Sequence, residues 1–132
     1  INRICIVCCF LFSTLMVNAQ SKKEIRNHDI TVKTIINVDY EDSNGDEEID
    51  EIEKYNSDGE VIERINYSDG KFDKHEKFAY NEDGEMIEET EYDEKGKLVG
   101  RIEYIYENGL RREKIYYDSA NKMVKKKLYK YE

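Results

Sequence analysis

Apolar and polar residues alternate along most of the chain after residue 30. Between residues 98 and 106, Leu98, Ile102 and Tyr104 fall on one side of an extended chain, whereas Arg101 and Glu103 fall on the other. An extended strand places successive side chains on opposite faces, so a period of two predicts strands rather than helices. The pattern predicts eight strands, over residues 30–40, 48–55, 61–67, 71–80, 85–92, 97–106, 110–117 and 122–131.

Turn-forming clusters separate the predicted strands at intervals of 11 to 14 residues. Most clusters begin with Asn, Asp, Ser or Glu after a tyrosine, and end on a residue that tolerates a positive φ angle. That residue is Gly59, Gly70, Gly84, Gly96, Gly109 or Asn121. Each unit is therefore one turn and one strand, and short strands joined by tight turns predict an antiparallel meander.

The predicted fold is all-β: an antiparallel β-meander of about eight short strands in a twisted, solenoid-like sheet. The strands carry too few apolar residues for a thick sandwich core. We expect one face to bury a stripe of Tyr, Ile, Leu and Val, and the other to carry Glu and Lys paired across strands. The repeat domain spans residues 30–132, and residues 20–29 are predicted to form a flexible leader.

The repeated phrase resembles a known repeat family. YDEKGKL at 92–98 and YIYENG at 104–109 resemble the tyrosine–aspartate (YD, or Rhs-type) repeats of bacterial surface and secreted proteins. MORN-like repeats are more distantly similar. The resemblance covers about residues 53–131 and implies a carbohydrate-binding surface protein or a shell that encloses a toxin. This chain is too short to close a shell, so the enclosing role is not carried over.

The first nineteen residues differ from the rest. Arg3 is their only charged residue, an apolar run follows, and small residues up to Ala19 precede a polar stretch. This pattern is typical of a secretory signal peptide cleaved after Ala19, and the run is short for a membrane span of about 20 residues. An uncleaved anchor is the alternative. All three cysteines lie in this segment. We expect a secreted, periplasmic or cell-surface protein whose mature chain has no membrane span.

Charge is distributed unevenly. Residues 110–132 contain eight basic and three acidic side chains, whereas residues 20–109 contain twelve basic and twenty-seven acidic ones. The acidic excess makes nucleic acid an unsuitable partner. The terminal lysines either protect an edge strand or bind an acidic protein, an anionic glycan or the acidic first hairpin of another copy. Exposed tyrosines would stack on sugars. The candidate partner-binding residues are Tyr104, Tyr106, Tyr116, Tyr117, Lys125, Lys126 and Lys127.

The chain offers little catalytic or metal-binding chemistry. The acidic loop 41–47 approaches the spacing of an EF-hand calcium loop, but Tyr40 stands at the first ligand position and the flanks are predicted strands. A solvated hairpin loop is therefore favoured over a divalent-cation site. His28 and His75 are the only histidines, and neither a Gly-x-Ser-x-Gly motif nor a phosphate loop is present. We expect no enzymatic activity and no cofactor.

Together these features predict an exported, non-catalytic β-repeat module that binds a partner or acts as a scaffold at the bacterial cell envelope or outside the cell. The partner would be an unidentified protein or glycan. Three alternatives remain open: a carbohydrate-binding module, a toxin-neutralising immunity protein, and a structural role through self-association of the oppositely charged ends.

Overall fold

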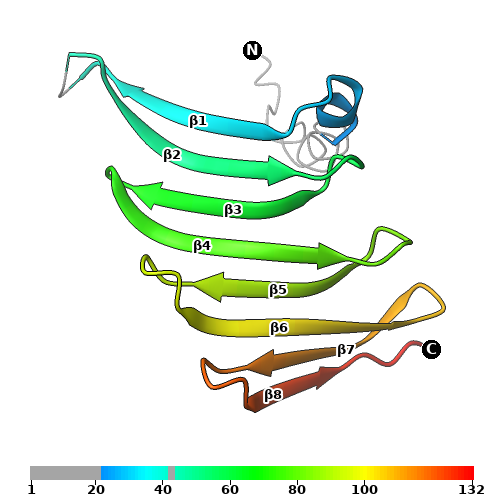
Figure 1. The fold of residues 1–132 in the computed structure, drawn as a ribbon. Helices are drawn as coiled ribbons and strands as arrows, with labels where there is room; N and C mark the ends of the chain where they lie inside the picture. Colours follow the sequence, from blue (N-terminus) through cyan, green and yellow to red (C-terminus); the bar gives the residue numbers. More distant parts are fainter. Residues whose placement is uncertain (1–21, 42–43) are drawn as a thin grey trace, which may run out of the picture.

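The computed structural model describes residues 22–41 and 44–132, which form one curved layer of eight antiparallel strands (Figure 1). Each strand pairs with the next one in the chain, so the sheet order is β1 to β8. The predicted all-β meander is confirmed, and only the end of β8 departs by more than two residues from the predicted bounds. The strands are β1 (Val32–Asp39), β2 (Asp46–Tyr55), β3 (Val61–Ser68), β4 (Lys71–Tyr80), β5 (Met86–Tyr92), β6 (Leu98–Glu107), β7 (Leu110–Tyr117) and β8 (Met123–Leu128).

Four turns share one hydrogen-bond pattern. In the turn 56–60, the Asn56 side-chain oxygen accepts bonds from the backbone N–H groups of Asp58 at 3.1 Å and Glu60 at 2.9 Å, and Gly59 has a φ of 78°. Equivalent bonds, from the second and fourth residues after an Asn or Asp, form the turns 81–85, 93–97 and 118–122. Asn121 replaces the glycine in the last of them, with a φ of 58°. The predicted turn chemistry is confirmed for these four turns, whereas in the two remaining turns after β3 and β6 Asp69 and Asn108 themselves have a positive φ, of 51° and 52°.

We count the strands after β1 as the hairpins β2–β3, β4–β5 and β6–β7. A tyrosine hydroxyl on the first strand of one hairpin donates to the backbone of the hairpin before it. Tyr80 donates to the Val61 carbonyl at 2.8 Å, and Tyr106 donates to the Met86 carbonyl at 3.0 Å. A third bond of this kind, from Tyr131 to the Arg111 carbonyl at 2.7 Å, follows β8. The three acceptors are spaced 25 residues apart. The structural repeat is therefore a two-strand hairpin rather than the single strand that the glycine spacing suggests.

The two faces of the sheet are not divided into an apolar side and a charged side, so that expectation is wrong. Among the described residues, the buried side chains include Tyr55 and Tyr104 but also Glu53 and Glu76. In the described structure no second layer covers either face, and the strands contain few apolar residues. Long charged side chains therefore cover the rings and pair with one another, keeping their charged ends in contact with partners or water.

A short helix over residues 22–27 replaces part of the flexible leader predicted over 20–29. Ile25 on this helix is buried, and the Lys22 Nζ lies 3.0 Å from the Glu60 Oε1. The helix thus covers the turn 56–60. Six residues are too few to show a helical hydrophobic period in the sequence. The predicted signal peptide, residues 1–19, lies outside the described residues.

None of the described residues belongs to a helix that is long and apolar enough to cross a membrane.

Candidate binding surface

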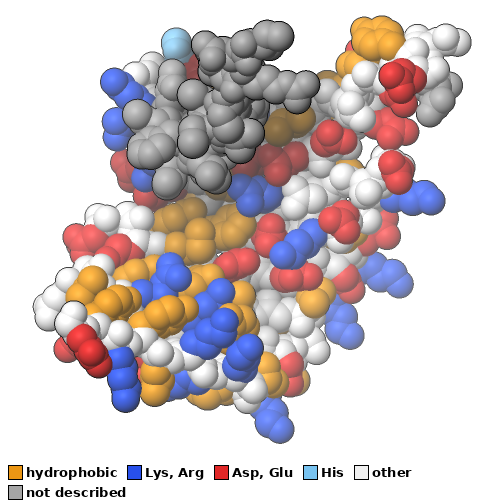
Figure 2. Space-filling model, turned by 180° about the vertical axis from the view of Figure 1, so that it is seen from behind, with side chains coloured by type: hydrophobic (Ala, Val, Ile, Leu, Met, Phe, Trp, Pro, Cys, Tyr) orange, Lys and Arg blue, Asp and Glu red, His pale blue; other side chains and the backbone are white. Residues whose placement is uncertain are grey.

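Tyrosine rings and basic side chains are interleaved over the last three strands. Figure 2 shows basic and hydrophobic side chains mixed over the lower part of the molecule, where these strands lie. Lys114 on β7 pairs with Tyr104 on β6 and with Lys127 on β8, which places all three on one face. We call this region the lysine–tyrosine surface. Its members are Tyr104, Tyr106, Arg111, Lys114, Tyr116, Lys125 and Lys127.

Three ammonium groups surround the ring of Tyr116. The Nζ atoms of Lys114, Lys125 and Lys127 lie 5.1, 5.4 and 5.9 Å from the ring centroid. Cations within about 6 Å of an aromatic ring are attracted to its face. Burial acts to raise the pKa of the Tyr116 hydroxyl, but Lys114 and Lys127 outweigh it and lower this pKa below 10.0. The site therefore concentrates positive charge at one point of the sheet.

Lys114 and Lys127 face each other directly across β7 and β8. Like charges in this position repel and destabilise a sheet. The described residues provide no carboxylate within ion-pair distance of Lys114, Lys125 or Lys127. No carboxylate of the described residues therefore offsets the charge of this pair. Burial acts to lower the pKa of Lys114, but the hydroxyls of Tyr116 and Tyr104 outweigh it and raise this pKa.

Opposing acidic pairs elsewhere in the sheet do have a bridging cation. Glu76 and Glu91 face each other, and the Lys74 Nζ lies 2.6 Å from one carboxylate and 3.5 Å from the other. The facing pair Glu88 and Glu103 is bridged in the same way by an arginine, Arg101, at 3.0 and 3.7 Å. By comparison, the pair formed by Lys114 and Lys127 has no bridging carboxylate among the residues that the structure describes. An external anion would supply one.

The rings of this surface hold cations rather than presenting open faces. Tyr104 is 7% exposed, its ring lies 4.5 Å from the Arg111 Cζ, and its hydroxyl donates to the Glu89 Oε2 at 2.9 Å. Burial and this carboxylate raise the pKa of Tyr104. Tyr106 uses its hydroxyl to link hairpins. A sugar ring stacking on Tyr104 would have to displace Arg111 or Lys114.

The predicted candidate residues divide between the two faces. Tyr104, Tyr106, Tyr116, Lys125 and Lys127 come together in the lysine–tyrosine surface. The other two, Tyr117 and Lys126, lie on the opposite face, where each contacts an acidic side chain of the same chain.

Tyr117 donates to the Glu103 Oε2 at 2.8 Å and lies 4.0 Å from the Arg101 Cζ, and Lys126 pairs with Glu113 at 2.7 Å. Lys114 and Arg111 were missed by sequence reasoning. The two-residue spacing between Lys114 and Tyr116 is the signal that would have found the first of them.

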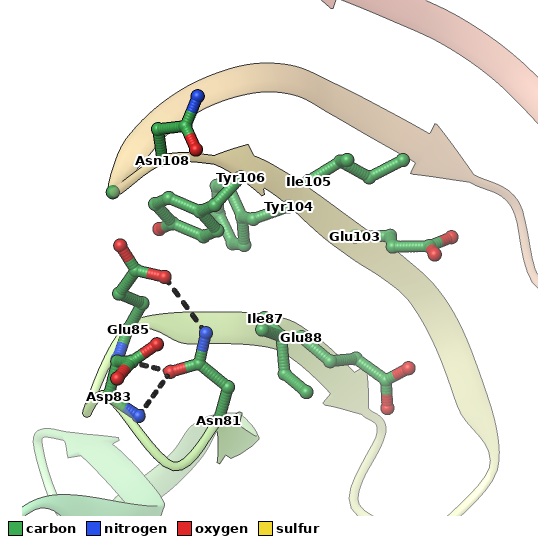
Figure 3. A pocket seen from close by; sticks show the side chains of 11 residues that line it. Asn81, Asp83, Glu85, Ile87, Glu88, Glu103, Tyr104, Ile105, Tyr106 and Asn108 are labelled. Atoms are coloured by element: carbon green, nitrogen blue, oxygen red, sulfur yellow. Dashed lines mark hydrogen bonds between the residues drawn. The ribbon is translucent and has the colours of Figure 1, made fainter.

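A cavity of about 560 Å³ opens where the hairpins β4–β5 and β6–β7 diverge (Figure 3). Glu85 extends toward Tyr106 and accepts a hydrogen bond from the Asn81 Nδ2 at 2.8 Å. Acidic side chains dominate the polar part of its lining, so it does not suit an anion. The charged lining residues are Asp83, Glu85, Glu88 and Glu103.

No group of His, Cys, Asp or Glu side chains in residues 22–41 and 44–132 is arranged to hold a metal ion. Residues 42–43 of the loop weighed as a calcium site lie outside the described residues.

No protein-family model, curated protein or solved structure matches the chain.

Proposed function

We propose that the protein is an exported, non-catalytic β-repeat module that binds an anionic partner through the lysine–tyrosine surface. The observation that carries this proposal is the facing pair of Lys114 and Lys127, which has no bridging carboxylate among the described residues. A bound anion converts a repulsive pair into a charge-assisted site, and such contacts are stronger than neutral hydrogen bonds. Export and an envelope or extracellular location rest on the signal-like residues 1–19.

The form of the sheet supports a binding or scaffold role. Its binding side chains stand on strands held by neighbouring strands, which fixes their spacing better than a mobile loop would. The resemblance to tyrosine–aspartate repeats of bacterial surface proteins points in the same direction. An acidic glycan or an acidic protein both provide the required charge. Stacking of a neutral sugar receives less support because cations cover the ring of Tyr104.

The proposal is tested by comparing two double variants with equal loss of charge. The full sequence is expressed in a bacterial host and the exported form is purified. Binding of dextran sulfate, as a polyanionic probe, is measured by calorimetry for the native protein, for Lys114→Gln/Lys127→Gln and for Lys95→Gln/Lys97→Gln. The control pair lies in the exposed turn 93–97. We expect a loss of about tenfold or more for the first variant only, and weaker native binding at higher salt.

Equal losses in the two variants would show that binding depends only on net charge, and no binding by the native protein would refute the proposal. Mass spectrometry of the exported protein tests the accompanying prediction that it begins at Gln20. Capture of partners from an envelope extract, with elution by salt, then identifies the natural ligand.

A further inference from the structure

Strand β8 is one edge of the sheet. Among the described strands it pairs only with β7, and all six of its residues are exposed. The Tyr129 N–H, just after β8, donates to the Arg112 carbonyl at 2.9 Å, so it points toward β7. Backbone groups alternate in direction along an antiparallel strand. The N–H groups of Lys126 and Leu128 therefore point away from the sheet, where an added strand could accept their hydrogen bonds.

Over the first four strands, rows of facing charges alternate in sign from strand to strand. One row runs from Lys33 on β1 through Glu53 and Arg64 to Glu76 on β4, each facing the next. The pairs at 2.7 Å between Arg64 and Glu53, and at 2.6 Å between Lys74 and Glu76, belong to the same face. Opposite charges on neighbouring strands stabilise a sheet, and like charges destabilise it.

A second row on the other face follows the same rule. Lys54 on β2, Glu63 on β3 and Lys77 on β4 face one another in turn. At the open edge, β8 presents Lys125 and Lys127 on the lysine–tyrosine surface. Within the sheet Lys127 faces Lys114 and Lys125 faces Tyr116, so a further strand is where carboxylates could face these two lysines, which are two residues apart.

We propose that β8 accepts an acidic, extended segment of a partner protein as a ninth, antiparallel strand, with carboxylates at alternate positions facing Lys125 and Lys127. This inference rests on the proposed function, because it takes the partner to be anionic and specifies it as a polypeptide. Main-chain hydrogen bonds at the edge would supply affinity, and the alternating carboxylates would supply selectivity.

A second copy of this chain fits the edge poorly. Pairing of β8 with another β8 brings lysines close together, and β1, the other edge strand, has a single acidic residue, Asp39, at its end. Lysines on an edge strand discourage such pairing. The same lysines favour an acidic strand, so protection against self-association and selection of the partner have one cause.

The test uses a synthetic peptide with the sequence DEEIDEIEKY of β2 as the probe, because it forms a strand in this sheet and carries Glu51 and Glu53 two residues apart. Its control has those two glutamates replaced by lysine. A third peptide keeps all charges but is N-methylated at alternate amides, so it cannot pair along one edge. We expect binding of the first peptide only, with slowed amide hydrogen exchange at Lys126 and Leu128 of the protein.

The matched protein variants are Leu128→Pro and Leu128→Ala. Leu128 is 64% exposed, and proline at this position removes an outward N–H without removing a bond to β7. We expect Leu128→Pro to bind the probe about tenfold more weakly than Leu128→Ala, because the edge loses a donor and gains a steric block. Both variants should bind dextran sulfate like the native protein, which also verifies that they fold.

Strand addition is wrong if the native protein does not bind the acidic peptide, or if the N-methylated peptide binds equally well. It is also wrong if the peptide binds without protecting Lys126 and Leu128. Retained binding of dextran sulfate in any of these cases would leave the proposed anion-binding function intact. Failure of that function would instead appear as loss of dextran sulfate binding by the native protein.

Discussion

At the scale of single residues, Glu53 shows how the sheet keeps a buried charge. The residue is 5% exposed, and its carboxylate is contacted by Lys33, by the Tyr55 hydroxyl and by Arg64, whose Nη2 lies 2.7 Å away. Burial alone would raise the pKa of Glu53, but the hydrogen bonds from these three groups outweigh it and lower the pKa from 4.5 to about 2. The folded state therefore favours the ionised carboxylate.

This arrangement predicts a pH-dependent role for Glu53 in stability. Because its folded pKa is lowered, its contribution is complete above pH 4.5 and is lost as the pH falls toward 2. We expect Glu53→Gln to lower the free energy of unfolding by about 2–3 kcal/mol at pH 7, and by progressively less below pH 4.5. Urea unfolding from pH 7 to pH 2.5 measures both effects. The control is Glu82→Gln, at an exposed position in the turn 81–85, and a constant difference across this pH range would contradict the prediction.

At the scale of elements, the turns that join the strands at one end of the sheet lie against one another. A Cβ atom on Gly84 would lie 3.0 Å from the Glu60 Oε1, which belongs to the preceding turn at the same end of the strands. A Cβ on Gly59 would lie 2.8 Å from the Lys22 carbonyl oxygen of the helix. The helix over residues 22–27 therefore packs against the turn 56–60 in the way that the turn 56–60 packs against the turn 81–85. By contrast, Gly96 lies in a turn at the opposite end of the strands, and no atom lies within 4 Å of such a Cβ there.

The three glycines separate backbone strain from the contacts between turns. All three have a φ between 75° and 78°, so replacement by alanine imposes similar strain. We expect Gly96→Ala to cost about 1 kcal/mol, Gly84→Ala to cost more because Glu60 must move, and Gly59→Ala to cost most because the helix backbone must move. Thermal or urea unfolding of the three variants measures the order. Equal costs would show that contacts between turns do not stabilise the protein.

The strands and turns could be predicted from the sequence because they depend on local chemistry: a period of two, and an Asn or Asp followed by a left-handed residue. Cross-strand partners could not, because each of the seven strand pairs contains a register shift. The candidate site could be predicted only in part, because its cross-strand partners depend on the same register. Charge and aromatic content identified Tyr116, Lys125 and Lys127, whereas the position of Lys114 between Tyr104 and Lys127 depends on register.

At the scale of the whole molecule, the described residues form a single sheet whose strands contact their neighbours in the chain and little else. Stability in such an array is approximately a sum over adjacent units, so the ends open more easily than the middle. The two ends differ here. The helix over residues 22–27 lies at the end that starts with β1, whereas β8 is bordered by β7 alone among the described strands.

Hydrogen exchange should therefore show a gradient along the chain. We expect the backbone amides of β8 that bond to β7 to exchange about tenfold or more faster than those at the centres of β4 and β5, because opening β8 breaks only one strand pair. Mass spectrometry of peptides from timed exchange measures this gradient. Uniform exchange over all eight strands would show that the sheet opens as one cooperative unit instead.

The hairpin repeat also limits how the length of this protein can change. A gene that gains or loses about 25 codons adds or removes one complete hairpin, and the later strands keep their direction and their tyrosine links, such as those from Tyr80 and Tyr106. Insertion of a single strand would reverse the direction of every strand that follows and move the later turns to the opposite end of the strands. Variation in length among proteins built on this plan should therefore occur in steps of one hairpin.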